Sequence, residues 1–278
     1  MAPGVLRGRG RHALATAGAF ALTLIVSFPV LWMVVLSVKP AAIMFNLPPV
    51  WLFTPTLEHY VYVLVEKGLW AAVVNSVVVS FASTALVVLI GTPAAYALAR
   101  FEIAGRDDLL LFVLATRMAP PIGLAVPFYL MFGRLHLLNS FVGLTLAYLT
   151  FNLSLYVWVL RSFCREIPYE LEEAALTEGY SRWQVFIRVA LPLLKPGIIA
   201  TAMLCLIFAW NEFLYAFILG GRDVQTLPVA IPRLITTRGV EWGALAALGL
   251  IAVVPVFVVV AVLQRHIVRG LTLGAVKG

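Results

Sequence analysis

Charged side chains are scarce in this sequence. Only 12% of its 278 residues are Asp, Glu, Lys or Arg, whereas 62% are hydrophobic and the mean hydropathy is +1.00. Soluble domains carry about 25% charged residues, so this chain cannot cover itself with a water-soluble surface. We therefore predict an integral membrane protein. The apolar residues come in long runs, which favours membrane-spanning helices over the alternating strands of a membrane β-barrel.

Cysteine and the common catalytic motifs are nearly or wholly absent. Cys164 lies at a predicted cytoplasmic edge and Cys205 inside a predicted span, so we expect no disulfide. The four histidines show no spacing typical of a metal site. No Gly-x-x-x-x-Gly-Lys-Ser/Thr motif occurs, so the chain is not expected to bind ATP phosphates. The absence of Gly-x-Ser-x-Gly and His-Glu-x-x-His motifs disfavours a membrane-embedded enzyme.

The apolar runs predict an all-α membrane protein with six transmembrane helices in a single domain, 1–278. The predicted spans are 13–38, 71–99, 108–132, 140–160, 196–219 and 243–263, followed by a tail at 264–278. The first run is about 25 residues long, too long for the apolar part of a signal peptide, so we predict an uncleaved span. The prolines of the third span are expected to break its helix, which is tolerated where a segment faces protein or a wet cavity.

The basic residues predict the orientation. Thirteen of the twenty Lys and Arg residues lie in the two terminal segments and in the loops after the second and fourth spans. Six lie in the other loops, and Arg117 lies within a span. Because positive charge concentrates on the cytoplasmic side of a membrane, both termini are expected in the cytoplasm. This distribution also explains the net charge of +7, so the bilayer rather than nucleic acid is the expected partner.

The segment 165–192 predicts a helix-turn-helix on the cytoplasmic side. Pro168 suits a first helical turn, and the glutamates that follow it suit the positive end of the helix dipole. Gly179 is placed to end this helix in a left-handed conformation. Ser181-Arg182-Trp183-Gln184 is typical of a capping box that begins a second helix, which we expect to stop before Pro192.

Each helix of this segment carries an apolar stripe at helical spacing. The stripes are Leu171, Ala174 and Ala175 in the first helix, and Trp183, Phe186, Ile187 and Ala190 in the second. Two interpretations stay open at this point. The stripes can dock against a partner in water, or the hairpin can lie on the membrane or pack on its own spans.

The same residues carry a family resemblance. Glu173-Ala174-Ala175, followed at fixed distances by Gly179 and Leu191-Pro192, resembles the EAA loop of binding-protein-dependent ABC importer permeases. Where that family usually has Asp-Gly-Ala, this chain has Glu178-Gly179-Tyr180. The resemblance implies a coupling helix that inserts into a cleft of an ATP-hydrolysing subunit. The residues that it implies for this contact are Glu173, Ala174, Ala175, Glu178, Gly179, Phe186, Leu191 and Pro192.

Two further stretches are similar to the maltose-type carbohydrate-uptake branch, on its shorter six-span subunit. They are Trp210-Asn211-Glu212-Phe213 and the tail, 264–278. The resemblance implies a multi-pass protein of the cell inner membrane that works with a second permease subunit, an ATPase dimer and an extracytoplasmic solute-binding protein. It also implies that ATP and Mg bind in the ATPase, that this chain holds no cofactor, and that its tail touches the ATPase.

Five residues are candidates for a substrate pathway. Arg117 and Glu212 are ionisable groups inside spans, which by default indicate function, although they can also form a structural ion pair. Asn152 and Asn211 can bind the hydroxyl groups of a solute or, equally, neighbouring helices. Tyr215 offers an aromatic face that suits a sugar ring, or a place in an interfacial belt.

Our leading hypothesis from the sequence is the permease subunit of an ATP-driven importer, which moves a sugar or sugar-like solute by alternating access. The alternative is a self-contained, ion-coupled secondary transporter of a polar solute. That alternative predicts internal repeat symmetry, which the sequence does not show.

Overall fold

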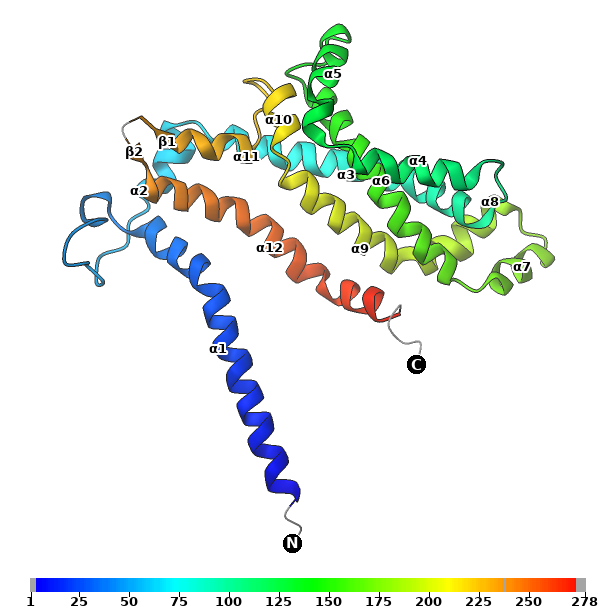
Figure 1. Cartoon of the computed structure of the whole chain (residues 1–278), viewed down its shortest axis with the longest axis horizontal. Helices are drawn as coiled ribbons and strands as arrows, with labels where there is room; N and C mark the ends of the chain where they lie inside the picture. The colour runs from blue at the N-terminus through cyan, green and yellow to red at the C-terminus, as the bar shows by residue number, and fades with distance from the viewer. Residues whose placement is uncertain (1–3, 238, 274–278) are drawn as a thin grey trace. The chain divides into compact units, whose positions relative to one another are not determined.

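The computed structural model describes residues 4–237 and 239–273, with the surroundings of side chains for 15–237 and 239–262. Helices dominate the described residues (Figure 1). The internal contacts fall into two compact units, formed by Met1–Gly68 with Arg233–Val253 and by Leu69–Pro232 with Val254–Gly278. The second unit contains the helices that the sequence places around a functional site.

The first unit combines long apolar helix with short, locally bonded elements. Its elements are α1 (Gly4–Val38), the 3-10 helix η1 (Ala41–Ile43), α2 (Glu58–Val61), the π-helix η2 (Tyr62–Glu66), the strands β1 (Ile235–Thr236) and β2 (Gly239–Val240), and the start of α12 (Trp242–Leu273). The strands pair antiparallel, with Ile235 opposite Val240. The loop after α1 is held by side chains: His59 Nε2 lies 2.9 Å from the Lys39 carbonyl oxygen, and the Tyr62 hydroxyl donates to Glu241 at 3.1 Å.

The second unit is built on three long helices, α3, α6 and α9. Its elements are α3 (Trp70–Arg100), α4 (Arg106–Met118), α5 (Pro121–Arg134), α6 (Phe141–Glu166), α7 (Tyr169–Thr177), α8 (Arg182–Val185), the π-helix η3 (Phe186–Ala190), α9 (Leu191–Trp210), α10 (Leu214–Leu219), α11 (Leu227–Ala230) and the 3-10 helix η4 (Ile231–Leu234), which runs into the first unit. Helices α3, α6 and α9 pack on one another, and α4 packs on α6 (Figure 1).

Five helices among the described residues are long and apolar enough to cross a membrane. They are Ala15–Val38, Trp70–Arg100, Phe141–Glu166, Arg182–Trp210 and Trp242–Val262. A sixth crossing exists if α4 and α5 together count as one broken span.

The third predicted span, 108–132, is not one helix. Helices α4 and α5 meet at an angle of 96°. Ala119 and Pro120 between them are extended, with ψ values of 126°. Pro120 disfavours helical geometry at Ala119, and neither Pro120 nor Pro121 has an N–H with which to continue the helix. The expectation that the prolines break this helix is confirmed.

The second helix of the hairpin does not stop before Pro192. The chain is helical without interruption from Arg182 to Trp210, through α8, the π-helical turn η3 and α9. The Leu191 N–H donates to the Phe186 carbonyl, five residues back, which widens the helix just before the proline. Pro192 then lies in the first turn of α9, where the missing donor is tolerated.

Three other boundaries also differ from the predicted ones. Helix α6 continues to Glu166 rather than ending at 160, and the fifth span ends at Trp210 rather than 219. Helix α12 continues to Leu273, so most of the predicted tail is helical; residues 274–278 lie outside the described residues.

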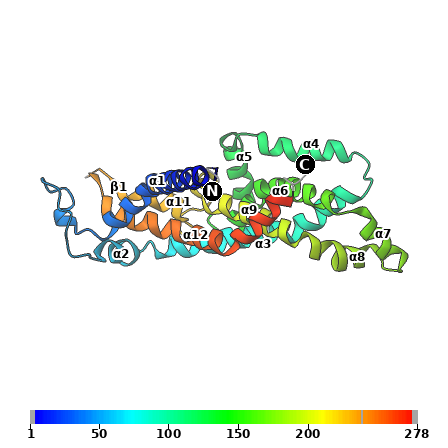
Figure 2. The same cartoon turned by 90° about the horizontal axis from the view of Figure 1, so that it is seen from below.

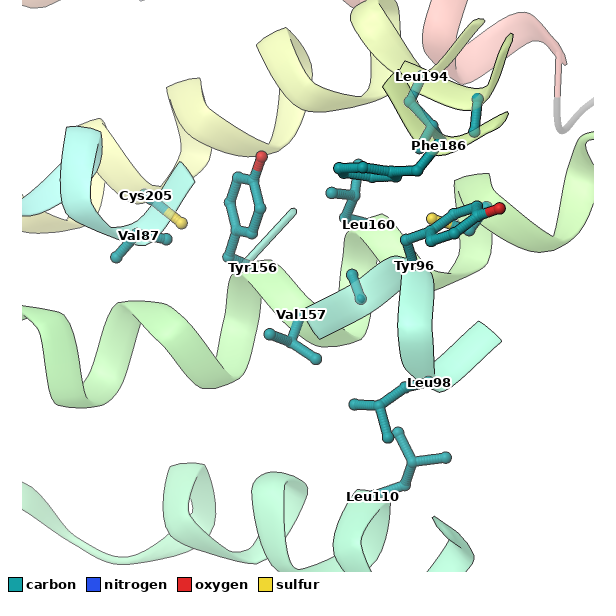
Figure 3. Close-up of a cluster of buried hydrophobic side chains, with 13 residues drawn as sticks. Val87, Tyr96, Leu98, Leu110, Tyr156, Val157, Leu160, Phe186, Leu194 and Cys205 are labelled. Atoms are coloured by element: carbon teal, nitrogen blue, oxygen red, sulfur yellow. The ribbon is translucent and has the colours of Figure 1, made fainter. Parts of the chain in front are cut away.

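Close approach between α3 and α6 depends on a small residue. A Cβ atom on Gly91 would lie 2.5 Å from Cδ1 of Tyr156. Tyr156 is fully buried, and its hydroxyl forms a hydrogen bond with the Thr92 hydroxyl at 2.8 Å. Figure 3 shows Tyr156 in a buried cluster with Val87, Leu160 and Cys205.

We expect Gly91→Ala to destabilise the protein by about 1–3 kcal/mol, because the added methyl group overpacks this contact. Gly18→Ala in α1 is the matched control, since a Cβ atom there meets nothing within 4 Å. Thermal unfolding of the purified protein in detergent measures the difference. Equal melting temperatures for the two variants would contradict the proposed contact.

Candidate functional site

The turn of the hairpin is fixed by local chemistry. At the end of α7 the Gly179 N–H donates to the Leu176 carbonyl and the Tyr180 N–H donates to the Ala175 carbonyl, which together form a Schellman motif. Gly179 has a φ of +90°, a value that favours glycine. The predicted end of the first helix at Gly179 is confirmed.

The start of the second helix is capped as the sequence predicts. Ser181 Oγ accepts from the Gln184 N–H at 3.3 Å, and the Gln184 side chain accepts from the Ser181 N–H at 2.8 Å. Both bonds of the capping box are therefore present. Helices α7 and α8 lie side by side at one end of the second unit (Figure 2).

One face of the hairpin packs on the protein's own spans. Ala175 is 6% exposed and Phe186 is 7% exposed, and the Phe186 ring lies 4.9 Å from the ring of Tyr96 in α3. Figure 3 shows Phe186 and Tyr96 in one buried cluster with Leu160. The side chains of Ala175 and Phe186 therefore pack inside the protein, whereas the sequence analysis assigned them to the contact with a partner.

The same face contains a buried ion pair that the sequence analysis did not find. Arg100 Nε donates to Glu172 Oε1 at 2.7 Å, and the Tyr96 hydroxyl donates to Glu172 Oε2 at 2.7 Å. The Arg100 and Glu172 side chains are 9% and 5% exposed. Glu172 was not distinguished from the other first-turn glutamates, because its partners lie more than seventy residues earlier in the sequence.

The opposite face of the hairpin is open. Glu173, Ala174, Glu178 and Gly179 are exposed. Three large apolar side chains share this exposure: Leu171, Trp183 and Ile187, at 47%, 64% and 42%. The stripes are thus divided. The chain itself covers Ala175, Phe186 and Ala190, whereas Leu171, Ala174, Trp183 and Ile187 are exposed.

A cavity of about 750 Å³ lies where two helix breaks face α6. One break is at residues 119–120, between α4 and α5, and the other is at residues 211–213, between α9 and α10. Interrupted backbone is tolerated at membrane depth where it lines a cavity or is covered by protein. The cavity is lined by residues of α3, α4, α5, α6, α9 and α10, together with residues from both breaks.

The cavity holds one positive and one negative side chain. The Arg117 guanidinium donates to the Phe151 carbonyl at 3.1 Å and lies 4.9 Å from the centre of the Phe208 ring. Glu212 accepts from the Tyr215 N–H at 3.0 Å, at the start of α10. Each charge is thus held by groups of the chain, and the two form no ion pair with each other among the described contacts.

Aromatic rings and hydroxyl groups complete the lining. The ring of Tyr215 stacks on Phe151 at 6.0 Å and 9°, and it lies 5.4 Å from Phe128. Thr116 and Ser154 hydrogen-bond each other at 2.9 Å across α4 and α6. Sequence reasoning missed these two hydroxyls; the position of Thr116 beside Arg117 was the only available indication.

The structure brings Arg117, Glu212 and Tyr215 to this cavity but not the two asparagines. Asn152 is fully buried and donates to the Cys205 carbonyl at 3.1 Å, so it joins α6 to α9. Asn211 is exposed and donates to the Ile207 carbonyl of its own helix at 2.8 Å. The structure thus shows both asparagines bonded to helix backbone and neither of them in the lining of the cavity. Within residues 4–237 and 239–273 no group of three or more His, Cys, Asp or Glu side chains is suited to a metal ion.

Solved structures share this fold. A chain of a bacterial ABC transporter involved in the import of the acidic polysaccharide alginate matches with a TM-score of 0.75 and 23% identity, over 95% of this chain and 98% of that chain. The MetNI methionine ABC transporter, in an inward-facing conformation, matches with a TM-score of 0.58 and 18% identity, over 75% of this chain and 96% of that chain. The fold is that of an ABC importer permease, and the all-α fold expected from the sequence is confirmed.

The sequence relatives agree with the fold. The trehalose transport system permease protein SugB of Mycobacterium tuberculosis is 37% identical over 95% of this chain and 98% of its own. The diacetylchitobiose uptake system permease protein DasC of Streptomyces coelicolor is 36% identical over 90% of this chain and 92% of its own. The trehalose/maltose transport system permease protein MalG of Thermococcus litoralis is 34% identical over 96% of this chain and 98% of its own.

Residues 87–273 match the family described as binding-protein-dependent transport system inner membrane component, and the chain belongs to this family. It is a transmembrane permease subunit of an ABC importer and a component of the inner membrane. The subunit is not the enzyme of the transporter, because ATP hydrolysis belongs to a separate subunit.

We expect a cysteine at Ser154 to react with a small water-soluble maleimide, because that side chain lines the cavity. The native Cys164 and Cys205, both 0% exposed, are internal controls that should stay unmodified in the folded protein. Intact-mass measurement of Ser154→Cys in lipid nanodiscs counts the added groups. If the folded protein takes up no maleimide while the denatured protein takes up three maleimide groups, the cavity is closed to water.

Proposed function

We propose that this permease imports a sugar or sugar-like solute, driven by a partner ATPase that grips the 165–192 hairpin. The observation that carries the proposal is the open face of that hairpin, on which Glu173, Ala174, Glu178 and Gly179 lie beside large apolar side chains. A helix that presents apolar anchors in this way suits a groove on another protein. Leu191 and Pro192 lie where the hairpin enters α9 and serve as its junction.

The continuous helix from Arg182 to Trp210 supports a mechanical role. Because α8 and α9 form one continuous helix, a displacement of the hairpin moves α9 and with it the lining residue Phe208, and Glu212 follows just beyond the end of this helix. In this proposal ATP and Mg bind in an ATPase dimer, closure of that dimer moves the hairpin, and the cavity changes its side of access. The hairpin and both termini are cytoplasmic, as the distribution of basic residues predicts.

The cavity suits a carbohydrate. The aromatic faces of Phe151 and Tyr215 can stack on the apolar face of a sugar ring, while Arg117, Glu212 and the hydroxyls of Thr116 and Ser154 can bind its hydroxyl groups. Relatives over nine-tenths or more of the chain are named for trehalose, maltose and diacetylchitobiose. This combination favours a di- or oligosaccharide.

The proposal includes further partners. A solute-binding protein delivers the sugar to the outer loops, 39–70 and 220–242. A second permease subunit completes the pathway, since the spans of one chain form only half of it. The end of the chain, including the C-terminal part of α12, also contacts the ATPase.

We expect Gly179→Pro to uncouple ATP hydrolysis from uptake. Proline cannot adopt the φ of +90° found at Gly179, so the Schellman turn and the orientation of α7 are lost. Import of radiolabelled trehalose per ATP hydrolysed, measured in proteoliposomes of the whole complex, should fall about tenfold, and Glu173→Ala should act in the same direction.

Glu170→Ala is the matched control, because Glu170 is an exposed glutamate of the same helix outside the motif. Wild-type coupling in Gly179→Pro would count against the docking role. Uptake by this chain alone, driven by an ion gradient without an ATPase, would instead support the secondary-transporter alternative.

A further inference from the structure

The Arg100–Glu172 ion pair joins the hairpin to two spans at one point. Glu172 receives hydrogen bonds at both carboxylate oxygens from α3, from Arg100 and from Tyr96. The Arg100 Nη2 atom also donates to the carbonyl of Ile167, the residue that follows α6, at 2.7 Å. The guanidinium lies 5.7 Å from the ring centre of Tyr169, the first residue of α7. One side chain of α3 therefore fixes both the end of α6 and the start of α7.

Because the Arg100–Glu172 pair is buried, it can hold α7 in a fixed orientation relative to α3 better than an exposed pair could. The side chains are 9% and 5% exposed, so water and salt screen the attraction only weakly. Removal of one partner of such a pair leaves an uncompensated buried charge, whereas apolar replacement of both partners is often neutral for stability. A buried pair that is satisfied by several bonds is thus better suited to fixing an orientation than to adding stability.

The position of Arg100 links this contact to the cavity. Arg100 is the last residue of α3, and Leu98 and Ala94, just before it, line the cavity. The other arm of the hairpin already reaches the cavity through the unbroken helix that contains α9. Helix α7 has no such covalent route to α3, since the two helices are far apart in the chain and Glu172 provides the charged connection between them.

We propose that Arg100 and Glu172 are positioning residues that transmit movement of the hairpin to α3, so that one ATPase contact drives two walls of the cavity. This inference rests on the proposed coupling role of the hairpin. In this arrangement α9 follows the hairpin because it is the same helix, and α3 follows it because Glu172 holds Arg100 and Tyr96.

The test uses the whole transporter complex and a cysteine reporter on α3. Ala94→Cys, in a background with Cys164 and Cys205 replaced by alanine, is labelled with a maleimide with and without ATP and Mg. We expect the double variant Arg100→Met/Glu172→Leu to assemble and to hydrolyse ATP within about twofold of the parent, because no buried charge is left unpaired. We expect the ATP-dependent change in labelling rate to fall about tenfold, because the double variant removes both hydrogen bonds to the Glu172 carboxylate and the bond from Arg100 to Ile167.

A purely structural pair would leave the ATP-dependent change in labelling intact in the double variant, and this result would overturn the proposal. Tyr96→Phe, which removes one hydrogen bond to Glu172 and no charge, is a second variant and should reduce the change by a smaller factor. If the ATP-dependent change in labelling is unaltered both in Tyr96→Phe and in the double variant, the contact has no role in transmitting movement from the hairpin to α3.

Arg106→Met provides the matched control. Arg106 approaches Asp107 at 3.6 Å, but Asp107 is 89% exposed, so this loop pair should contribute little and its loss should not alter labelling. The variant Gly179→Pro separates the two proposals. If it abolishes the ATP-dependent change and the double variant does not, only the role of Arg100 and Glu172 is overturned; if the parent itself shows no ATP-dependent change, both proposals fail.

Discussion

A helix that crosses hydrocarbon must satisfy its own backbone hydrogen bonds, and this constraint determines where the chain can be interrupted. The second unit has interruptions at residues 119–120 and 211–213, and both border the same cavity. Irregular backbone is costly against lipid but acceptable against a polar or protein-lined space. The two breaks therefore explain why charged, hydroxyl and aromatic groups collect at this place and why the remaining spans can stay long and regular.

The function that we propose places a different constraint on the hairpin, which has to be attached firmly to the spans and still present a free surface. Its two faces divide these tasks. Ala175 and Phe186 are covered by the core, while Trp183 and Ile187 are open. A hairpin that was covered on all sides could not bind a partner, and one without an inner face could not pass a force on to the spans.

Features set by local chemistry were predictable from the sequence. The turn at Gly179 and the capping box at Ser181 depend on neighbouring residues only, and both occur as predicted. The membrane class and the all-α fold follow from composition and long apolar runs. The continuous helix through Pro192 was not predictable. The helix accommodates this proline through a π-helical turn, and the residue pattern does not indicate such a turn.

Features set by contacts between distant segments could be predicted only in part. Arg117 and Glu212 were recognised as candidates because a charged side chain inside a membrane span costs free energy and therefore indicates a function. The separation of Asn152 from the cavity depends on the packing of α6 against α9, and the contact of Glu172 with Arg100 depends on the packing of α7 against α3. Residue types alone do not distinguish a buried glutamate from its exposed neighbours in the same helical turn.

The π-helical turn Phe186–Ala190 has a consequence for the two surfaces that it separates. An α-helix advances about 100° per residue, so one surplus residue in a turn rotates everything beyond it by about that angle. The angular phase between the open face around Trp183 and the cavity face of α9 is therefore set by a single inserted position. Deletion of one residue there would preserve both helices and every cap, yet it would rotate the open face around Trp183 by about a quarter of a turn about the axis of α9.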